Sequence, residues 1–389
     1  MYAPLTFALI AAGLGFVSAQ ENTGVSGKIQ FAGVGYDSTF KPVKRIKDGE
    51  GEGCYCELST SEKWFSGVNA PFNGPLAVHI RSPVNLTKFA HYISDDFVIG
   101  ADNSSGWSRG AYFDYSTDVP HMENVTFLGH VGDTSECLGK SLGFIGADGV
   151  TKTKGNYPPA KYLNITDGVE YLLYSNTTCP KSKIANGCGV YRKGVKAFYG
   201  FDGATKMFLF EFTMPTYRAP AANSPSIWLS TDSLPRVTEN YFNDTACSCI
   251  SQGCGALNLF NANATHMNSS LITLQGQEDV EYADLIKGNV GDGYFERPTD
   301  TPVVGGVIFD SVGNVVTFIA DNATFDPNLS AASVNEMLSS VPELGTTDHL
   351  KPGKLTAPKE SFQWNAASTS KPGQIMLISA ALVIAAVLF

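Results

Sequence analysis

The sequence predicts an all-β protein, and two observations carry this prediction. Short β-rich runs are separated by Gly, Pro, Asn and Asp throughout the 389-residue chain, which contains 39 Gly and 20 Pro. The regular alternation of strands and helices that marks a parallel α/β sheet is missing. A composition of 43% hydrophobic and 16% charged residues is that of a globular protein.

Three runs predict individual strands, and one run predicts a helix. Residues 208–212 alternate, which places three Phe side chains on one face of a strand and Leu209 with Glu211 on the other. Residues 303–309 and 315–319 are rich in the residues that strands favour. The one helix that the sequence favours clearly covers residues 331–340.

Composition divides the chain into five segments. A polar, Gly-containing stretch at residues 94–106 predicts a boundary between a small cysteine-containing β module, residues 20–98, and a larger unit, residues 99–325. The larger unit has a size that suits a β-sandwich. A short helix and a stalk rich in Lys, Pro, Thr and Ser follow over residues 326–365. Residues 1–19 and 366–389 are expected to be removed.

The N-terminal residues read as a secretory signal peptide. An apolar run over residues 5–17 leads to the small residues Ser18 and Ala19, so that cleavage leaves Gln20 as the mature N-terminus. Because no Lys or Arg precedes the run, a buried first strand is the alternative.

The C-terminal residues read as the signal for a glycosylphosphatidylinositol (GPI) anchor. The small residues 365–367 precede a polar spacer, residues 368–374, and an apolar run that continues to Phe389. We expect attachment at Asn365, with Ser368 as second choice. A single-pass tail anchor is the alternative, although it needs about 20 apolar residues.

Glycosylation sequons and cysteines agree with a secreted protein. Eight cysteines, an even number, predict disulfides in an oxidising compartment: Cys54, Cys56, Cys137, Cys179, Cys188, Cys247, Cys249 and Cys254. Zinc binding at Cys247, Cys249 and Cys254 is the alternative, but no fourth ligand is spaced nearby. The N-x-S/T pattern occurs at Asn85, Asn103, Asn124, Asn164, Asn176, Asn243, Asn263, Asn268, Asn322 and Asn328.

Charge and motifs argue against several classes of function. The chain has 27 basic and 37 acidic residues, a net charge of −10, and no basic stretch, so nucleic acid is not an expected partner. No phosphate-binding glycine loop is present, and no cofactor is expected. The histidines lack an H-E-x-x-H pattern, so no metal is expected; they are His79, His91, His121, His130, His266 and His349.

The run from Gly139 to Gly143 satisfies the G-x-S-x-G pattern of a hydrolase nucleophile elbow, with Ser141 at its centre. An elbow requires a strand before the serine and a helix after it. Residues 144–149 instead predict a second strand and a turn, so a serine hydrolase is disfavoured.

Several stretches, taken in order, resemble one family. They are residues 76–83, 107–112, 189–194, 206–215, 226–229, 234–236, the cysteine-rich segment 247–261, and 294–299. The chain resembles the fungal cell-wall family that contains the yeast protein named "target of SBF". The resemblance implies a concanavalin-like jelly-roll β-sandwich similar to glycoside hydrolase family 16, with a small N-terminal β module. It also implies a glucan endo-1,3-β-glucosidase, with β-1,3-glucan or a related wall polysaccharide as partner.

The family carries a G-E-x-D-x-F-E-like run directly after the cysteines. A retaining glycosidase needs two carboxyl groups about 5–5.5 Å apart, and a third can tune them. Positions two apart on a strand share a face, and a bulge returns a later residue to that face. The matching positions in this chain are Ala256, Asn258 and Asn261, none of which is an acid.

Binding can survive the loss of catalysis. Sugar faces stack on aromatic rings, and amides and hydroxyls bond sugar hydroxyls. The predicted substrate-binding residues are Trp107, Arg109, Tyr112, Trp228, Asn258 and Asn261. Both Trp residues have the alternative of belonging to the core. Glu211 and Asp232 are substitute acids in principle, but lone carboxylates are usually solvated or hydrogen-bonded.

The sequence therefore leaves three functions open. The first is a secreted, GPI-anchored wall protein that binds or organises β-1,3-glucan with a degenerate glucanase domain. The second is an active endo-β-1,3-glucanase or transglycosylase that uses displaced carboxylates. The third is a structural surface glycoprotein that binds no glucan. We also expect that glycans at Asn263 and Asn268 crowd the cleft, unless both residues point outward.

Overall fold

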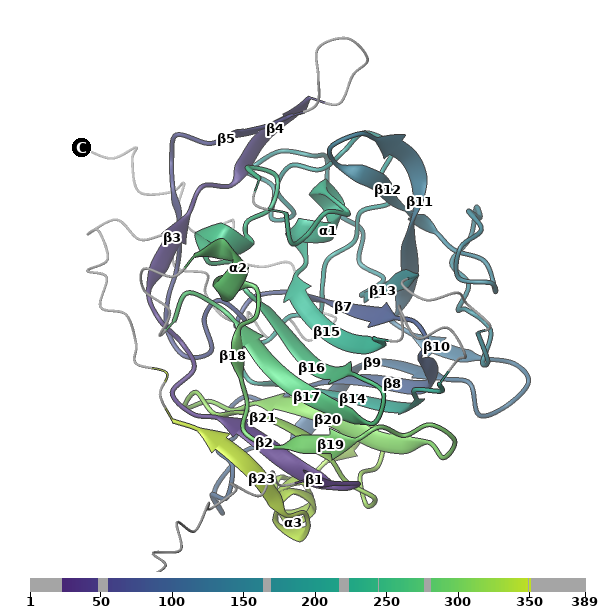
Figure 1. Cartoon of the computed structure of the whole chain (residues 1–389), viewed down its shortest axis with the longest axis vertical. Helices are drawn as coiled ribbons and strands as arrows, with labels where there is room; N and C mark the ends of the chain where they lie inside the picture. The colour runs from purple at the N-terminus through teal and green to yellow at the C-terminus, as the bar shows by residue number, and fades with distance from the viewer. Residues whose placement is uncertain are drawn as a thin grey trace, which may run out of the picture.

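The computed structural model describes residues 23–47, 55–163, 169–216, 224–243, 245–275, 281–348 and 350. Two large β-sheets lie face to face and form a sandwich (Figure 1). Nearly all neighbouring strands run antiparallel; the parallel exceptions are β1 with β19 and β2 with β23. The prediction of an all-β sandwich is confirmed.

Among the described residues the larger sheet has ten strands, and β16, which follows the three clustered cysteines directly, is one of its inner strands. Its order is β1, β19, β17, β16, β15, β7, β13, β11 and β12, and β18 pairs separately with β17. The strands are β1 (Thr23–Gly24), β7 (Leu76–Arg81), β11 (Thr126–Ser135), β12 (Gly139–Phe144), β13 (Glu170–Tyr174), β15 (Ser226–Thr231), β16 (Ala256–Ala262), β17 (His266–Ile272), β18 (Asn289–Val290) and β19 (Tyr294–Glu296).

The smaller sheet has nine strands, in the order β10, β9, β8, β14, β20, β21, β2 and β23, with β22 paired to β9. Its strands are β2 (Gly27–Phe31), β8 (Asn85–Ile93), β9 (Trp107–Asp114), β10 (His121–Glu123), β14 (Lys206–Thr213), β20 (Val303–Phe309), β21 (Val315–Ile319), β22 (Asn328–Leu329) and β23 (Glu343–Thr347). Two small two-stranded sheets lie outside the large ones: β3 (Ser38–Phe40) pairs with β6 (Lys63–Phe65), and β4 (Val43–Lys47) pairs with β5 (Tyr55–Leu58).

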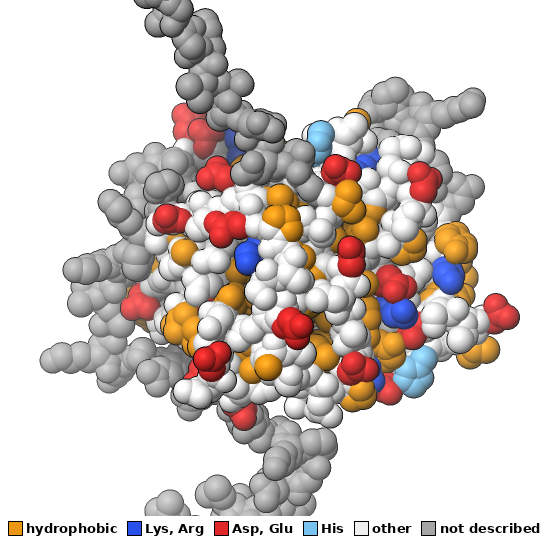
Figure 2. Space-filling view, turned by 90° about the horizontal axis from the view of Figure 1, so that it is seen from below, with side chains coloured by type: hydrophobic (Ala, Val, Ile, Leu, Met, Phe, Trp, Pro, Cys, Tyr) orange, Lys and Arg blue, Asp and Glu red, His pale blue; other side chains and the backbone are white. Residues whose placement is uncertain are grey.

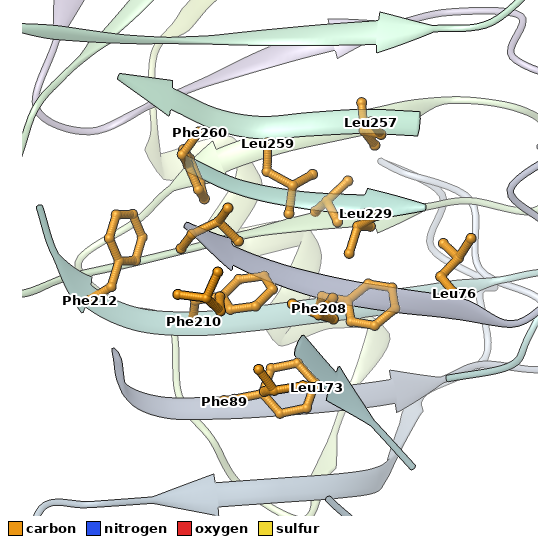
Figure 3. Close-up of a cluster of buried hydrophobic side chains, with 14 of the residues drawn as sticks. Leu76, Phe89, Leu173, Phe208, Phe210, Phe212, Leu229, Leu257, Leu259 and Phe260 are labelled. Atoms are coloured by element: carbon orange, nitrogen blue, oxygen red, sulfur yellow. The ribbon is translucent and has the colours of Figure 1, made fainter. Parts of the chain in front are cut away.

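The main core fills the space between the two sheets. Phe208, Phe210 and Phe212 of β14 point into it, whereas Leu209 belongs to a second cluster on the other face of that sheet. In Figure 3 these Phe side chains face Leu257, Leu259 and Phe260 from the opposite sheet. The alternation predicted for residues 208–212 is confirmed, as are the strands predicted over 303–309 and 315–319.

The predicted helix is α3 (Ala331–Ser340), with the bounds expected from the sequence. Ser330 caps it, because its side chain accepts a hydrogen bond from the Ser333 backbone N–H at 3.0 Å. Val334, Met337 and Leu338 pack on the outer face of the smaller sheet. Two further short helices are α1 (Ser233–Val237) and α2 (Tyr282–Leu285). Within the described ranges, no helix is long and apolar enough to cross a bilayer.

The segment predicted as an N-terminal module contributes to both sheets. Strand β2 lies between β21 and β23 in the smaller sheet, and β7 lies between β15 and β13 in the larger one. Strand β8 pairs with β14 and β9. Residues on both sides of position 98 therefore complete the same sandwich, and the boundary at that position stays a prediction.

Disulfides join several loops at one end of the sandwich. Cys56 bonds Cys247, Cys179 bonds Cys188, and Cys249 bonds Cys254. Cys137 is also disulfide-bonded, and Cys54 lies outside the described residues. The disulfide interpretation is confirmed for the described cysteines, so Cys247, Cys249 and Cys254 are not zinc ligands.

The predicted signal peptide, Gln20 and the GPI site at Asn365 lie outside the described residues, and those predictions remain untested. Most of the predicted stalk also lies outside the described residues. Its first residues are described and form part of strand β23. Seen from the side of α3, acidic side chains outnumber basic ones on the surface (Figure 2), in keeping with the net charge of −10.

Candidate functional site

A cleft of about 860 Å³ lies on the outer face of the larger sheet. Its floor includes Arg81, Glu170, Ser226, Trp228, Asn258 and Asn261. The residues that alternate with these, such as Ile80, Ile227 and Leu257, belong to the main core. Because successive side chains on a strand point to opposite faces, the floor residues point away from the core.

A row of polar residues crosses five strands of this floor. Strand register places Asn268 opposite Asn261, Asn261 opposite Ser226, Ser226 opposite Arg81, and Arg81 opposite Glu170. We call these five residues the polar row. It combines amide, hydroxyl, guanidinium and carboxylate groups, which together supply both hydrogen-bond donors and acceptors.

Strand β16 brings the positions of the family motif to the cleft by means of a bulge. The register with β17 shifts between Asn258 and Asn261, and both Leu259 and Phe260 enter the core. Asn258 and Asn261 therefore share the cleft face, as the motif spacing predicts. The Asn258 side chain donates to Ser270 Oγ at 3.0 Å.

The disulfide loop before β16 sets where this strand begins. Cys249 and Cys254 close a loop around the short 3₁₀ helix η2 (Ile250–Gln252). Gly253 and Gly255 follow with φ values of 97° and 69°, a backbone conformation that glycine adopts without strain. Ala256 comes next, fully buried in a small cluster that contains Trp228 and Ile272. Its methyl group lies beneath the cleft surface.

Glu170 is the most tightly held carboxylate in the cleft. One oxygen, Oε1, lies 2.8 Å from His79 Nδ1, and the other, Oε2, accepts from Trp228 Nε1 at 2.9 Å. Burial raises the pKa of Glu170, but the charge and hydrogen bond of His79, with the bond from Trp228, outweigh it and bring the pKa below the usual 4.5. Glu170 is therefore an ionised acceptor.

A histidine and a tyrosine form the facing wall. His130 Nδ1 lies 2.8 Å from the Lys140 carbonyl oxygen, which only accepts, so this nitrogen carries the proton. His130 Nε2 then accepts from the Tyr241 hydroxyl. Burial lowers the pKa of His130 and keeps the ring neutral. Burial and the nearby Glu170 charge raise the pKa of Tyr241, so its hydroxyl stays protonated.

Glu239 is a second carboxylate that lines the cleft. Its Oε2 accepts the backbone N–H of Lys140 at 2.5 Å. Among the described residues, no group of three His, Cys, Asp or Glu side chains is arranged to hold a metal ion. The cleft offers hydrogen bonding by neutral groups, by these two carboxylates and by the cationic side chains of Arg81 and Lys140.

The aromatic residues divide into a buried ring and an exposed one. Trp228 is only 3% exposed, stacks on His79 with centroids 3.5 Å apart, and is flanked by Tyr241. Trp228 thus belongs to a small buried cluster, and its Nε1–H donates the hydrogen bond to Glu170. Phe242, 36% exposed and 5.4 Å from Trp228, presents the accessible ring at the cleft.

The remaining predicted sugar-binding residues lie on the smaller sheet. Trp107 is 1% exposed and packs on Phe97, with centroids 4.8 Å apart. Arg109 donates to the Phe325 carbonyl at 2.6 Å and lies over the Tyr112 ring at 3.9 Å. The expectation that these three residues neighbour Asn258 does not match their positions, because β9 belongs to the opposite sheet.

The two substitute acids also lie away from the cleft. Glu211 of β14, on the smaller sheet, accepts from Thr87 Oγ1 at 2.7 Å and Lys88 Nζ at 2.9 Å. Asp232 forms a two-point ion pair with the buried Arg236, at 2.9 and 3.2 Å. Both carboxylates have the hydrogen-bonded structural environment that the sequence analysis preferred.

The G-x-S-x-G run lies entirely in β12, with Ser141 buried and no helix directly after it. It therefore does not form a nucleophile elbow.

Most of the predicted sequon asparagines are exposed. Asn85 and Asn268 are half-buried, and Asn164 lies outside the described residues. The exposed ones are Asn103, Asn124, Asn176, Asn243, Asn263, Asn322 and Asn328. Asn243 also lines the cleft.

Sequence reasoning missed Glu170, Tyr241 and Phe242. Glu170 opens an otherwise apolar strand, and such an isolated acid is a signal that a strand-by-strand search can find. Tyr241 and Phe242 form an aromatic pair just before the cysteine-rich segment. Nothing in the sequence places either beside Trp228.

Comparison with known proteins identifies the family to which the chain is similar. The family described as cell wall protein YJL171C/Tos1 matches with its N-terminal part over residues 27–94 and its C-terminal part over residues 105–337. The chain is 40% identical over 357 residues to the "Probable circularly permuted 1,3-beta-glucanase YJL171C" of Saccharomyces cerevisiae, covering 88% of each chain.

Two further relatives carry similar names. The "Probable circularly permuted 1,3-beta-glucanase PGA52" of Candida albicans is 39% identical over 316 residues, which is 79% of this chain and 80% of the relative. The Saccharomyces cerevisiae protein with the same designation and the name TOS1 is 34% identical over 249 residues, 61% of this chain and 50% of its own. No solved structure matches the chain. On the extent of these matches, the chain belongs to the YJL171C/Tos1 family of cell wall proteins.

Proposed function

We propose that this protein is a GPI-anchored cell-wall protein that binds β-1,3-glucan in the cleft and does not cleave it by the two-carboxylate mechanism. The names of its relatives support a glucan as the ligand and the wall as the location. The single observation that carries the proposal is the placement of Asn258 and Asn261. Both amides lie on the cleft face of the bulged strand, where the family motif carries acids.

The loss of those acids removes the ordinary chemistry of the site. An amide neither ionises nor donates a proton as an acid does, and Ala256 has no nucleophilic atom. Losing the nucleophile and the acid together raises the barrier by about 5–8 kcal/mol, a factor of roughly 10⁴ to 10⁶ in rate. Hydrogen bonding to sugar hydroxyls is unaffected by that loss.

The polar row supports binding. Arg81 and Asn261 are exposed, Glu170 and Asn268 are half-buried and Ser226 is buried, so the accessible part of the row presents both donors and acceptors. Phe242 supplies an exposed ring on which a sugar face can stack. A volume of about 860 Å³ is enough for several sugar residues.

A displaced catalytic pair is the second candidate function. Glu170 and Glu239 both line the cleft, and this observation favours it. Against it, both oxygens of Glu170 already accept bonds from His79 and Trp228, and as an ionised group Glu170 has no proton for a leaving group, so Glu239 alone would have to act as the acid.

The test uses the full chain expressed in a yeast host. Pull-down on insoluble β-1,3-glucan measures binding, and release of reducing sugar from laminarin measures hydrolysis. Binding without release is the expected result. Release by the unmodified protein, abolished by Glu170→Gln, would establish the second candidate. Failure to bind any glucan would establish a purely structural glycoprotein. Release of the protein from membranes by a phosphatidylinositol-specific phospholipase tests the anchor.

A restored variant sharpens the result. The triple change Ala256→Glu, Asn258→Asp and Asn261→Glu is expected to gain laminarin hydrolysis. The double change without Ala256→Glu is its control and is expected to stay inactive, because it lacks the nucleophile. Ala256 is fully buried, so the triple variant is compared with wild type by circular dichroism. If it misfolds, the wild-type assay still decides between the candidates.

A further inference from the structure

One sequon lies at the edge of the cleft. Helix α1 leads into residues 239–243, which line one wall of the cleft. Asn243 is exposed at the end of this wall and directly follows Phe242, the exposed aromatic ring of the site. Among the sequon asparagines of the described segments, Asn243 is the one that lines the cleft.

The local backbone leaves this asparagine accessible. The Asn243 backbone N–H bonds the Asn240 carbonyl at 3.3 Å, which closes a turn over residues 240–243, and the Thr245 N–H bonds the Asn243 carbonyl at 2.8 Å. Thr245, the hydroxyl residue of the sequon, is exposed as well. An exposed turn is the setting in which N-x-S/T asparagines accept glycans.

The two sequons expected to crowd the cleft fit this role less well. Asn263 lies in the turn between β16 and β17, where its Oδ1 accepts from the N–H groups of Thr265 and His266 at 3.0 and 2.9 Å, and it does not line the cleft. Asn268 is half-buried within β17, and its Oδ1 is fully buried. A buried amide in a strand leaves little space for a bulky modification.

We propose that Asn243 carries an N-glycan that covers the mouth of the cleft and limits the access of glucan to it. The transfer forms a bond between Asn243 Nδ2 and the first sugar C1. The bond between that carbon and a lipid-linked pyrophosphate donor breaks, and the pyrophosphate leaves while the amide gives up one proton. The gating effect rests on the proposed glucan binding, whereas occupancy of Asn243 is independent of it.

The expected effect follows from the fraction of time that the mouth is open. When a site can bind only part of the time, its apparent affinity equals the intrinsic affinity multiplied by the fraction of time that it is open. We therefore expect removal of the glycan to tighten binding of soluble laminarin oligomers by about threefold to tenfold. Phe242 directly precedes Asn243 in the sequence, so its ring is the part of the site that the glycan is expected to cover first.

Two changes remove the sequon in different ways. Asn243→Gln alters the side chain that carries the glycan, whereas Thr245→Ala leaves Asn243 in place. Both are expected to tighten binding equally. Thr245→Ser keeps the sequon and the hydroxyl that the Cys247 N–H bonds at 3.3 Å, so it should bind as wild type does. Asn322→Gln removes an exposed sequon on the loop after β21, on the opposite sheet, and is the matched control.

Glycopeptide mass spectrometry of the full chain from a yeast host measures occupancy, and titration with laminarin oligomers measures affinity. An unmodified Asn243 overturns the proposal. The proposal is also overturned if Asn243 carries a glycan but its removal leaves the affinity for laminarin oligomers unchanged. In that case the proposed glucan binding is still supported. Absence of binding by every variant overturns the proposed function, and the gating with it. Tightening by both sequon changes, but by neither control, supports the proposal.

Discussion

The outer faces of the two sheets differ sharply, although the same strand periodicity produces both. On the smaller sheet the outward residues include Tyr92, Trp107 and Leu209, and they are buried beneath α3 and the loop that leads to it. On the larger sheet the outward residues around the cleft include Arg81, Glu170 and Asn261, which line its open surface. An apolar outer face therefore coincides with a covering element, and a polar one with an open site.

This difference teaches how to interpret aromatic residues on strands. Trp107 and Trp228 both stand on outward faces, and both are nearly inaccessible, at 1% and 3% exposure. Trp107 packs beneath α3 and the loop that precedes it, whereas Trp228 donates a hydrogen bond to the Glu170 carboxylate. Neither tryptophan ring is therefore accessible for stacking on a ligand, whereas the exposed ring of Phe242 is.

The largest expected effect is on the covered face. Trp107→Ala removes a fully buried ring from the cluster beneath α3, and we expect it to reduce the free energy of unfolding by about 3–5 kcal/mol. Urea denaturation followed by circular dichroism measures this. Glucan pull-down under conditions where the variant is folded should be unchanged, and a selective loss of binding would place Trp107 in the site.

Glu170→Gln tests the open face. Because the carboxylate accepts bonds from His79 and Trp228, replacing one oxygen with NH₂ leaves a buried donor unpaired, at a cost of about 1–3 kcal/mol. We also expect glucan binding to weaken by about tenfold, since bonds to a charged group contribute about 1.5–3 kcal/mol. Glu211→Gln, the same change on the smaller sheet, should leave binding unaffected.

The pH dependence of stability tests the ionised state of Glu170 further. The pKa of Glu170 is lowered in the folded protein, so its contribution to stability is present above the unfolded value, near 4.5, and is lost as pH falls through the folded value. The stability difference between wild type and Glu170→Gln should therefore be full at pH 7 and shrink below pH 4.5. Thermal unfolding across this range measures it; a difference that grows with acidity contradicts the assignment.

Phe242→Ala tests the exposed ring. Loss of a stacking surface is expected to weaken glucan binding by about threefold to tenfold, from about 0.5–1.5 kcal/mol. Stability should change little, because the ring is 36% exposed. Phe242→Tyr keeps the ring and should retain binding, so weakening by both variants would rule out stacking as the cause.

The smallest expected effect comes from Tyr112→Ala. Tyr112 lies on the smaller sheet and bonds Asp114 Oδ2 at 2.8 Å, remote from the polar row. Glucan affinity measured by titration should stay within about twofold of wild type, a difference below about 0.5 kcal/mol. A larger loss would show that sugar also binds the smaller sheet.

Much of the local structure could be predicted from the sequence. The bounds of β20, β21 and α3 agree with the runs that predicted them, because alternation and helical capping are local properties. The spacing of Asn258 and Asn261 likewise indicated a shared face reached by a bulge. Each of these predictions depends on residues within about ten positions of one another in the chain.

The composition of the site could not be predicted in the same way. Glu170 lies beside His79 and Trp228 because β13, β7 and β15 are neighbours in the sheet. In the chain, His79 and Trp228 are 149 positions apart. For the same reason, Arg109 and Tyr112 were expected beside Asn258 but lie on the opposite sheet.

The sequence by itself determined the fold class, several of the strands, the disulfide-rich character and the presence of Ala256, Asn258 and Asn261, none of them an acid, after the cysteines. Only the tertiary structure decided which strands lie side by side, which outward face is covered and which aromatic ring remains exposed. The physical reason is that alternation along a strand sets the face of each side chain, whereas its neighbours are set by strand order and register between distant segments.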